Sequence, residues 1–212
     1  MIRTWVADIR PLLDETCYQE YYEHMPKFRQ KKADALKLVQ GKAQSIGVWY
    51  LYEQMKKENG NQKDAAYNLS HSGEYVLCSV HEGKDPKIRV GCDIEEIGIC
   101  NMKIARRFFC RSEYEKIDSE TNEERRRELF FRYWVLKESF IKATREGMAM
   151  GLDTFEIALG ENGNPSVLLE RPSRYREPFY YMESATEDQK YRIAVCSTDE
   201  EIDPKIRVME FV

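Results

Sequence analysis

The stretch Trp134-Val-Leu-Lys-Glu-Ser-Phe-Ile-Lys142 decides the fold of this chain, because it predicts a helix with chemistry on one face. Side chains four positions apart share a face of an α-helix, so Glu138 and Lys142 are expected to stand together beside Trp134. In an arbitrary helix such a pair is only a surface ion pair that contributes about 0.3 to 0.5 kcal/mol. A second acidic pair upstream makes a functional interpretation possible.

That second pair lies in the segment Lys87–Glu95, where apolar residues alternate with polar or small ones. The period of two predicts a half-buried strand, paired as a hairpin with the preceding strand Tyr75–Val80. Asp93 and Glu95 would then project from the same face. If Glu138 joins them, the three carboxylates raise one another's pKa unless a cation neutralises them, and a hard divalent ion such as Mg²⁺ prefers carboxylate oxygens.

The length and composition of the chain limit the functions that it can have. The 212 residues allow one large domain or two small packed lobes. A net charge of -4 and a pI near 5.6 argue against nucleic acid as a partner. Early charges at Arg3, Asp8 and Arg10 interrupt any signal peptide, and no apolar run is long enough for a membrane span. The six cysteines lack metal-binding spacing and are typical of buried thiols in a reducing cytoplasm.

The remaining pattern alternates helices with short strands. An opening strand is expected around Thr4 to Ile9, and the late runs after Gly147 read as mainly antiparallel strands. Three helices are expected, at about Pro26 to Tyr52, Met102 to Tyr114 and Thr121 to Glu146. A weak internal repeat between residues 74–80 and 190–197 favours two similar lobes.

Two features near the first long helix have both an ordinary and a functional interpretation. The basic residues of its first turns, Lys27 and Lys31 among them, form either a solvated face or a seat for a phosphate. His71 lies in the polar loop Asn68-Leu-Ser-His-Ser-Gly73, which opens into an apolar strand, and a lone histidine is more often structural than functional.

Four motifs together resemble the 4′-phosphopantetheinyl transferases, in order and in spacing. They are Asn68-Leu-Ser-His-Ser-Gly73, Gly91-Cys-Asp-Ile-Glu95, Ala105-Arg-Arg-Phe-Phe-Cys-Arg-Ser-Glu-Tyr114 and Trp134-Val-Leu-Lys-Glu-Ser-Phe-Ile-Lys142. The long, Sfp-like type is the better match, and the resemblance extends in register from about residue 26 to residue 157.

The resemblance implies an α/β (α+β) fold of two similar lobes, each a small antiparallel sheet packed with a long helix. The lobes would form a pseudo-dimer with the active site in the cleft between them, divided into residues 1–104 and 105–212. The implied reaction is Mg²⁺-dependent transfer of the phosphopantetheine arm of coenzyme A to a serine of an apo acyl or peptidyl carrier protein. The implied protein is a cytoplasmic monomer.

The matching positions imply roles for individual residues. Asp93, Glu95 and Glu138 would hold Mg²⁺, and Glu138, or a water that it orients, would take the serine proton. Lys142 would neutralise charge on the phosphate, with Asp93 beside it as a third catalytic residue. The residues expected to bind coenzyme A are Lys27, Lys31, Gln44, Ser70, His71, Lys137 and Lys142.

One departure and two alternatives stay open at this point. Many relatives carry a Gly-Lys-Pro segment that frames the adenine, whereas the corresponding interval here, residues 58–64, has no proline. Instead of an enzyme, the chain could be a carrier- or nucleotide-binding module of the same fold. The run Arg125-Arg-Arg127 could meet an acidic carrier helix or could simply be a solvated face.

Overall fold

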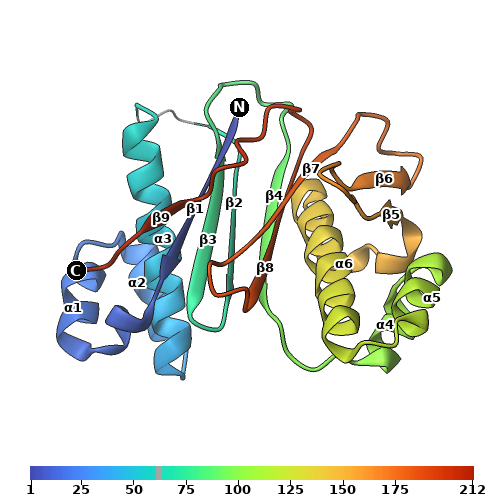
Figure 1. The fold of residues 1–212 in the computed structure, drawn as a ribbon. Helices are drawn as coiled ribbons and strands as arrows, with labels where there is room; N and C mark the ends of the chain where they lie inside the picture. Colours follow the sequence, from blue (N-terminus) through green and yellow to red (C-terminus); the bar gives the residue numbers. More distant parts are fainter. Residues whose placement is uncertain (61–63) are drawn as a thin grey trace.

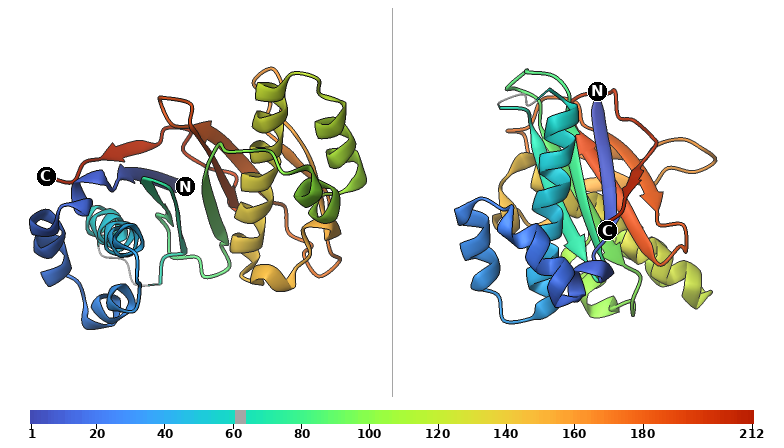
Figure 2. Two further views of the ribbon diagram at one scale, coloured as in Figure 1. Left: turned by 90° about the horizontal axis from the view of Figure 1, so that it is seen from below. Right: turned by 90° about the vertical axis from the view of Figure 1, so that its left-hand side faces the viewer.

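The computed structural model describes residues 1–60 and 64–212, and it has four layers in the order helix, sheet, sheet, helix. Figures 1 and 2 show α3 covering the outer face of the first sheet and α6 covering the outer face of the second. Part of the interval in which the Gly-Lys-Pro segment is missing, residues 61–63, lies outside the described residues.

The elements alternate along the chain as the sequence predicts. The α-helices are α1 (Glu15–Glu23), α2 (Lys27–Asp34), α3 (Val39–Glu58), α4 (Met102–Phe108), α5 (Arg111–Ser119) and α6 (Glu123–Thr144). Short 3-10 helices are η1 (Arg10–Leu13), η2 (Gly147–Ala149) and η3 (Leu152–Thr154). The strands are β1 (Ile2–Asp8), β2 (Tyr67–Ser72), β3 (Tyr75–His81), β4 (Val90–Glu96), β5 (Glu156–Ala158), β6 (Val167–Glu170), β7 (Tyr180–Ala185), β8 (Tyr191–Ser197) and β9 (Arg207–Met209).

Side-chain alternation along the strands builds three separate apolar cores. In β3, Val76 and Cys78 face α3, while Leu77 faces the second sheet. In β8, Ile193 faces the first sheet, while Ala194 faces α6. Because successive residues of a strand point to opposite faces, each sheet buries both of its faces, one against its helix and one against the other sheet.

The second sheet corrects one prediction. Strand β4 was expected to pair with β3 as a hairpin, but it pairs antiparallel with β8, with Val90 opposite Ser197 and Glu96 opposite Tyr191. The predicted alternation itself is confirmed, since Val90, Cys92 and Ile94 are buried between the sheets. A period of two identifies the buried face of a strand, but it contains no information on which strand lies alongside.

Three further local predictions are corrected. The helix expected from Pro26 to Tyr52 is two helices, α2 and α3, separated by residues 35–38. The helix that begins at Met102 was expected to end near a turn at residues 110–112 and to resume at Glu113, and it does so as α4 and α5, except that α5 begins earlier, at Arg111. The Ser-His segment, expected as a loop, is strand β2, which forms a hairpin with β3 through a turn at Gly73.

The predicted fold class is confirmed, since small and mainly antiparallel sheets each pack against a long helix. The strands, however, are shared between the two halves of the chain. Strand β4 precedes residue 104 and belongs to the second sheet, while β9 follows it and pairs parallel with β1 of the first sheet. The division at residue 104 therefore stays a prediction.

The expectation of buried thiols is met at three of the six cysteines. All six cysteines are free thiols, and Cys78, Cys92 and Cys196 are buried. Within the described part of the chain, no helix combines the length and apolar character that a membrane span requires.

Candidate active site

The site is built where helix α6 crosses strand β4, and Gly91 makes the crossing possible. A Cβ atom at residue 91 would collide with the carbonyl oxygen of Ser139 and with the backbone nitrogen of Ala143. Helix and strand can therefore lie backbone to backbone only because residue 91 has no side chain. This approach brings Lys142 of the helix to Asp93 of the strand.

A Gly91→Ala variant is expected to lose about 3 kcal/mol of unfolding free energy, the upper end of the usual cost of overpacking, because the clash is with backbone that cannot rotate away. Chemical denaturation would measure the loss. The matched control is Gly98→Ala, where a Cβ would meet only the ring of Phe131 at 3.9 Å. Equal stability of the two variants would contradict the account of the crossing.

Asp93, Lys142 and Ser70 form a closed triangle at this crossing. The Lys142 Nζ lies 2.6 Å from Asp93 Oδ1 and donates to Ser70 Oγ at 2.8 Å. The Ser70 hydroxyl donates to the same Asp93 oxygen at 2.9 Å. Asp93 is only 2% exposed, so this ion pair is made where water competes little.

Burial and mutual charge set the ionisation of these groups. Burial raises the pKa of Asp93, although the Lys142 ammonium opposes the rise. Burial alone would lower the pKa of Lys142, but Asp93 and other neighbours raise it above its ordinary value. The pKa of Glu138 is raised by burial and then by the Asp93 charge. The two carboxylates therefore repel each other across the same ammonium.

Glu95 completes the acidic group. Its carboxylate accepts a hydrogen bond from the Ser72 hydroxyl at 2.8 Å. The pKa of Glu95 is raised by burial and by the charge of Asp93, while Ser72, Lys142 and Trp134 oppose the rise. Trp134 of the signature helix therefore lies close enough to Glu95 to act on its charge.

A cleft opens beside this group between β2 and α6. Its volume is about 590 Å³, and its walls include Tyr67, Asn68 and Leu69 from β2 and Glu138, Ile141 and Lys142 from α6. A carboxylate and an ammonium therefore line a cavity that a ligand can enter.

The group of carboxylates Asp93, Glu95 and Glu138 shares one feature with metal sites, a buried oxygen that has no hydrogen-bond partner among the described residues. In residues 1–60 and 64–212, no three His, Cys, Asp or Glu side chains gather closely enough to hold one as the side chains stand. However, the second oxygen of Asp93, Oδ2, is buried and makes no hydrogen bond to the residues that the structure describes. A buried carboxylate oxygen without a partner, beside two carboxylates with raised pKa values, fits a hard divalent cation.

The same region of the chain matches a known protein family. Residues 89–196, which contain β4, α6 and β8, match the family model of the 4′-phosphopantetheinyl transferase superfamily. This chain belongs to that superfamily. The resemblance identified from the four sequence motifs is therefore confirmed.

Individual relatives of the superfamily support the longer type. The chain is 30% identical over 148 residues to the 4′-phosphopantetheinyl transferase Sfp of Bacillus subtilis, which covers 70% of this chain and 62% of that protein. It is 37% identical over 131 residues to the 4′-phosphopantetheinyl transferase psf-1 of Bacillus pumilus, which covers 62% of this chain and 52% of that protein. The matched regions span less than two thirds of these relatives.

The remaining positions implied by the superfamily are placed as follows. His71 is exposed at the end of β2, and its pKa is lowered by partial burial of the ring and by the ammonium groups of Lys142 and Lys32. Lys31 is exposed on α2, and Lys27 donates to the side chain of Gln30 at 3.1 Å. Gln44 does not point freely outward, because its amide donates to the Gly73 carbonyl at 2.9 Å.

Lys137 requires a correction. It was expected to bind coenzyme A, but it is completely buried on another face of α6, in an ion pair with Glu113 at 2.9 Å. Its ammonium also donates to the carbonyl oxygens of Leu152 and Phe155, at 2.8 and 2.6 Å. Neighbouring residues of a helix point about 100° apart, so only one of Lys137 and Glu138 can face the cleft. Lys137 therefore holds helix α6 in place and does not contact the cleft.

Several functional neighbours were missed from the sequence. Ser72 holds Glu95, and Asn68 accepts a hydrogen bond from the Cys92 backbone at 3.1 Å. Their spacing with Ser70, every second residue, was a usable signal, because it is the period of one strand face. The prediction of a loop for residues 68–73 hides this spacing, because a loop has no regular side-chain period.

Proposed function

We propose that this protein transfers the 4′-phosphopantetheine group from coenzyme A to a serine hydroxyl of an apo acyl or peptidyl carrier protein. The transfer depends on Mg²⁺ and releases adenosine 3′,5′-bisphosphate. The observation that carries the proposal is the Asp93–Lys142 pair, buried at the wall of a cleft that Glu138 also lines. The presence of Asp93, Glu95 and Glu138 together favours catalysis over a binding module without turnover.

The reaction forms one phosphorus–oxygen bond and breaks another. The carrier serine oxygen attacks the phosphorus that bears the pantetheine arm, and the bond from this phosphorus to the bridging oxygen of the diphosphate breaks. Glu138, or a water that it orients, accepts the serine proton. A pKa raised by burial suits this role, because a stronger base accepts a proton more readily. The bridging oxygen leaves on the adenosine 3′,5′-bisphosphate.

Lys142 stabilises the negative charge that develops on the phosphate and on the leaving group. Its pKa is raised despite burial, so it stays protonated, and it is held in place by Asp93 and Ser70 before a ligand arrives. Preorganised positive charge in a site with little water is the main source of catalysis in phosphoryl transfer. Asp93, Glu95 and Glu138 would hold Mg²⁺, which when bound neutralises the diphosphate.

Mg²⁺ is expected to stabilise the protein against heat even in the absence of substrate. At ten times the dissociation constant, binding to the native state alone adds about 1.4 kcal/mol. An Asp93→Asn variant should lose this increment, because it lacks the charge at the buried oxygen. Glu96→Gln, at the next exposed position after Glu95, is the control that should keep it. Thermal unfolding with and without Mg²⁺ measures the stabilisation of each variant by the ion. Equal stabilisation of the two variants would contradict the assignment of Asp93 as a metal ligand.

The nucleotide end of coenzyme A is proposed to lie towards α2 and His71. Lys31 and Lys32 are exposed there, and the charge of Lys32 already acts on the His71 ring. A protein with a net charge of -4 needs such a local cationic site for a ligand that carries several phosphates. Lys27 and Ser70 are further members of this proposed site.

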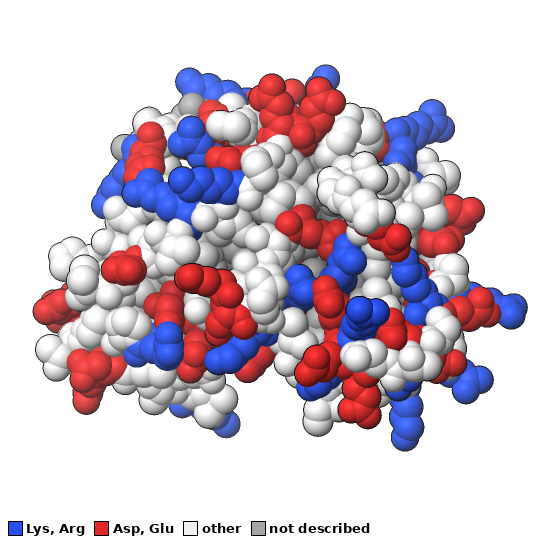
Figure 3. All heavy atoms as spheres, in the orientation of Figure 1, with Lys and Arg blue, Asp and Glu red and all other residues white. Residues whose placement is uncertain are grey.

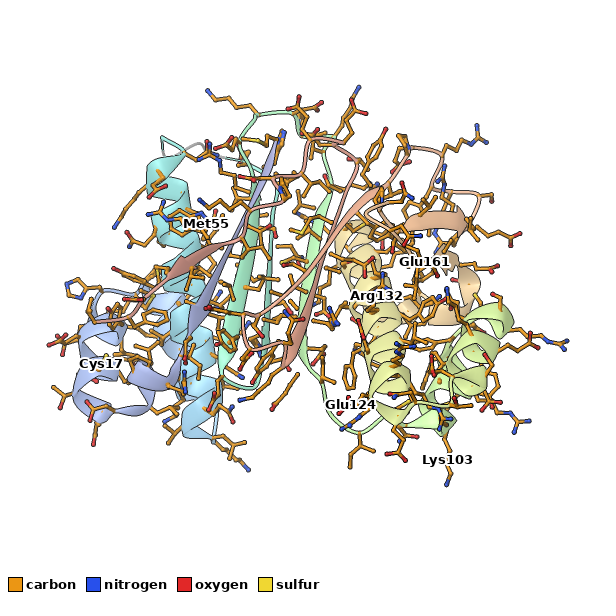
Figure 4. All side chains as sticks on the ribbon, viewed as in Figure 1. Cys17, Met55, Lys103, Glu124, Arg132 and Glu161 are labelled. Atoms are coloured by element: carbon orange, nitrogen blue, oxygen red, sulfur yellow. The ribbon has the colours of Figure 1, made fainter. Side chains whose placement is uncertain are left out.

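The carrier protein is proposed to approach the second lobe near residues 107–130. Lys103 and Glu124 lie at the same end of that lobe (Figure 4), at the starts of α4 and α6. Basic and acidic side chains are mixed over this part of the surface (Figure 3), so charge alone does not select an acidic partner. We further propose that the protein acts as a cytoplasmic monomer.

The test is a carrier modification assay. The protein is incubated with coenzyme A, Mg²⁺ and each of several apo acyl and peptidyl carriers, and carrier mass is followed. The expected result is a gain of one phosphopantetheine group on at least one carrier, abolished when its acceptor serine is replaced by alanine. No gain on any carrier would overturn the proposed function.

A further inference from the structure

Strands β2 and β4 lie in different sheets, and polar side chains join them. Asn68 accepts from the Cys92 backbone at 3.1 Å, and Ser70 donates to Asp93 at 2.9 Å. Ser72 donates to Glu95 and accepts from the Glu96 backbone at 3.2 Å. We name Asn68, Ser70 and Ser72 the polar seam. Single side chains make this junction between β2 and β4. The position of β2 relative to β4 therefore also depends on the contacts that β2 makes elsewhere.

The polar seam ends at the turn around Gly73, and side chains of helix α3 form hydrogen bonds to one side of this turn. The Gly73 carbonyl oxygen accepts two hydrogen bonds, from the amide of Gln40 at 2.7 Å and from the amide of Gln44 at 2.9 Å. Residues four apart lie on the same face of a helix, so both amides converge on one acceptor. Two donors on a single carbonyl fix its direction as well as its position.

The second lobe holds the same turn from the other side. The hydroxyl of Tyr191, on β8, accepts a hydrogen bond from the Glu74 backbone at 3.1 Å. Gly73 has a φ of 51°, and a Cβ there would collide with the Tyr191 hydroxyl and come within 2.8 Å of the Glu96 carboxylate. The turn is therefore clamped between α3 and the second sheet, with no room for a side chain.

We propose that Gln40 and Gln44 are positioning residues for coenzyme A. They fix the Gly73 turn, and through it they hold Ser70 and His71 in register with Asp93 and Lys142. In this role Gln44 affects the affinity for the nucleotide but does not contact the nucleotide. This proposal replaces the expectation from the sequence that Gln44 binds coenzyme A directly. The inference rests on the proposed function only in the identity of the ligand, since all the groups that make the clamp belong to this chain.

The test is a Gln40→Leu/Gln44→Leu double variant, compared with Gln54→Leu on the same helix. Four quantities are measured: the pKa of His71 by NMR without ligand, the dissociation constant of adenosine 3′,5′-bisphosphate by calorimetry, and KM and kcat with a carrier. In the double variant, the His71 pKa should rise towards its ordinary value of 6.5, because the ring becomes less buried and moves away from the ammonium groups of Lys142 and Lys32. The dissociation constant and KM should increase about tenfold, the loss expected for two hydrogen bonds, with kcat within about twofold of wild type.

The outcomes separate positioning from direct contact. Weaker nucleotide binding with an unchanged His71 pKa would overturn the proposal and favour direct contact by Gln44. Unchanged binding and an unchanged His71 pKa, as in Gln54→Leu, would also overturn it. If the double variant does not fold, Tyr191→Phe releases the turn from the other side and should shift the same quantities. Because the His71 pKa is read without ligand or carrier, failure of the carrier assay alone would count against the proposed function and not against the clamp.

Discussion

A Glu138→Gln variant is expected to transfer phosphopantetheine about 10² to 10⁴ times more slowly than the wild-type protein, the usual contribution of general acid–base catalysis. The amide keeps the shape of the side chain, but it accepts no proton and carries no charge for a metal ion. Glu138 lines the cleft, and its pKa is raised by burial and by Asp93, as a base near the reacting group requires. Carrier mass measured against time, at saturating coenzyme A, gives the rate.

The matched control is Glu124→Gln, a carboxylate on the exposed first turn of the same helix. It should leave the rate within about twofold, as expected for a surface substitution. Glu124→Gln should also bind adenosine 3′,5′-bisphosphate like the wild type. If Glu138→Gln modified the carrier as fast as Glu124→Gln, Glu138 would be neither the base nor an essential metal ligand.

A Lys137→Met variant is expected to lose about 3 to 5 kcal/mol of unfolding free energy, the cost of breaking a buried ion pair on one side. Lys137 is 0% and Glu113 1% exposed, so the methionine would leave a carboxylate buried without its cation. Burial already raises the pKa of Glu113, and the Lys137 charge opposes that rise. Removing the charge should raise this pKa further. Denaturant unfolding at neutral pH measures the free energy.

Lys116→Met is the control for that measurement. Lys116 also forms an ion pair, with Glu161 at 2.8 Å, but both side chains are exposed to solvent. Such pairs contribute at most about 1 kcal/mol, so the control should unfold near the wild type. A similar small loss in Lys137→Met would show that Glu113 finds water or another donor, and that the buried pair does not hold α6.

Much of the fold was predictable because local patterns determine it. The periodicity around Trp134 predicted α6 to within two residues at each end, and the alternation around Asp93 identified the buried face of β4. The convergence of Asp93 and Lys142 was also predictable, since one lies on a strand face and the other on a helix that the family motifs associate with it. These are properties of short segments, which side-chain spacing records directly.

The errors occurred where distant residues decide the structure. Strand β4 pairs with β8, which alternation cannot reveal, because any strand with a matching apolar face would satisfy the pattern. Lys137 was assigned to the ligand because the family motif carries it, whereas its ammonium is held by Glu113 and by the carbonyl groups of Leu152 and Phe155. In both cases the missing information was a partner far away in sequence.

The break between α2 and α3 has a different cause. Residues 35–38 contain no glycine or proline, and the apolar spacing continues across them. The chain nevertheless leaves the helix there, because Leu38 takes an extended conformation with its side chain largely exposed. Packing of α2 against α3, through Ala33, Ile46 and Trp49, outweighs the local preference for one continuous helix.

The pairing of β4 with β8 also has a consequence for the order in which the site forms. Val90 pairs with Ser197. The strand that carries Asp93 and Glu95 therefore cannot pair with β8 until that much later part of the chain has been synthesised. On the ribosome, a nascent chain that has not reached Tyr191 would hold these acids on a strand with an open edge. Contacts this distant in sequence form late in folding. Catalytic competence should therefore appear only after Ser197 has been made, later than the helices of both lobes.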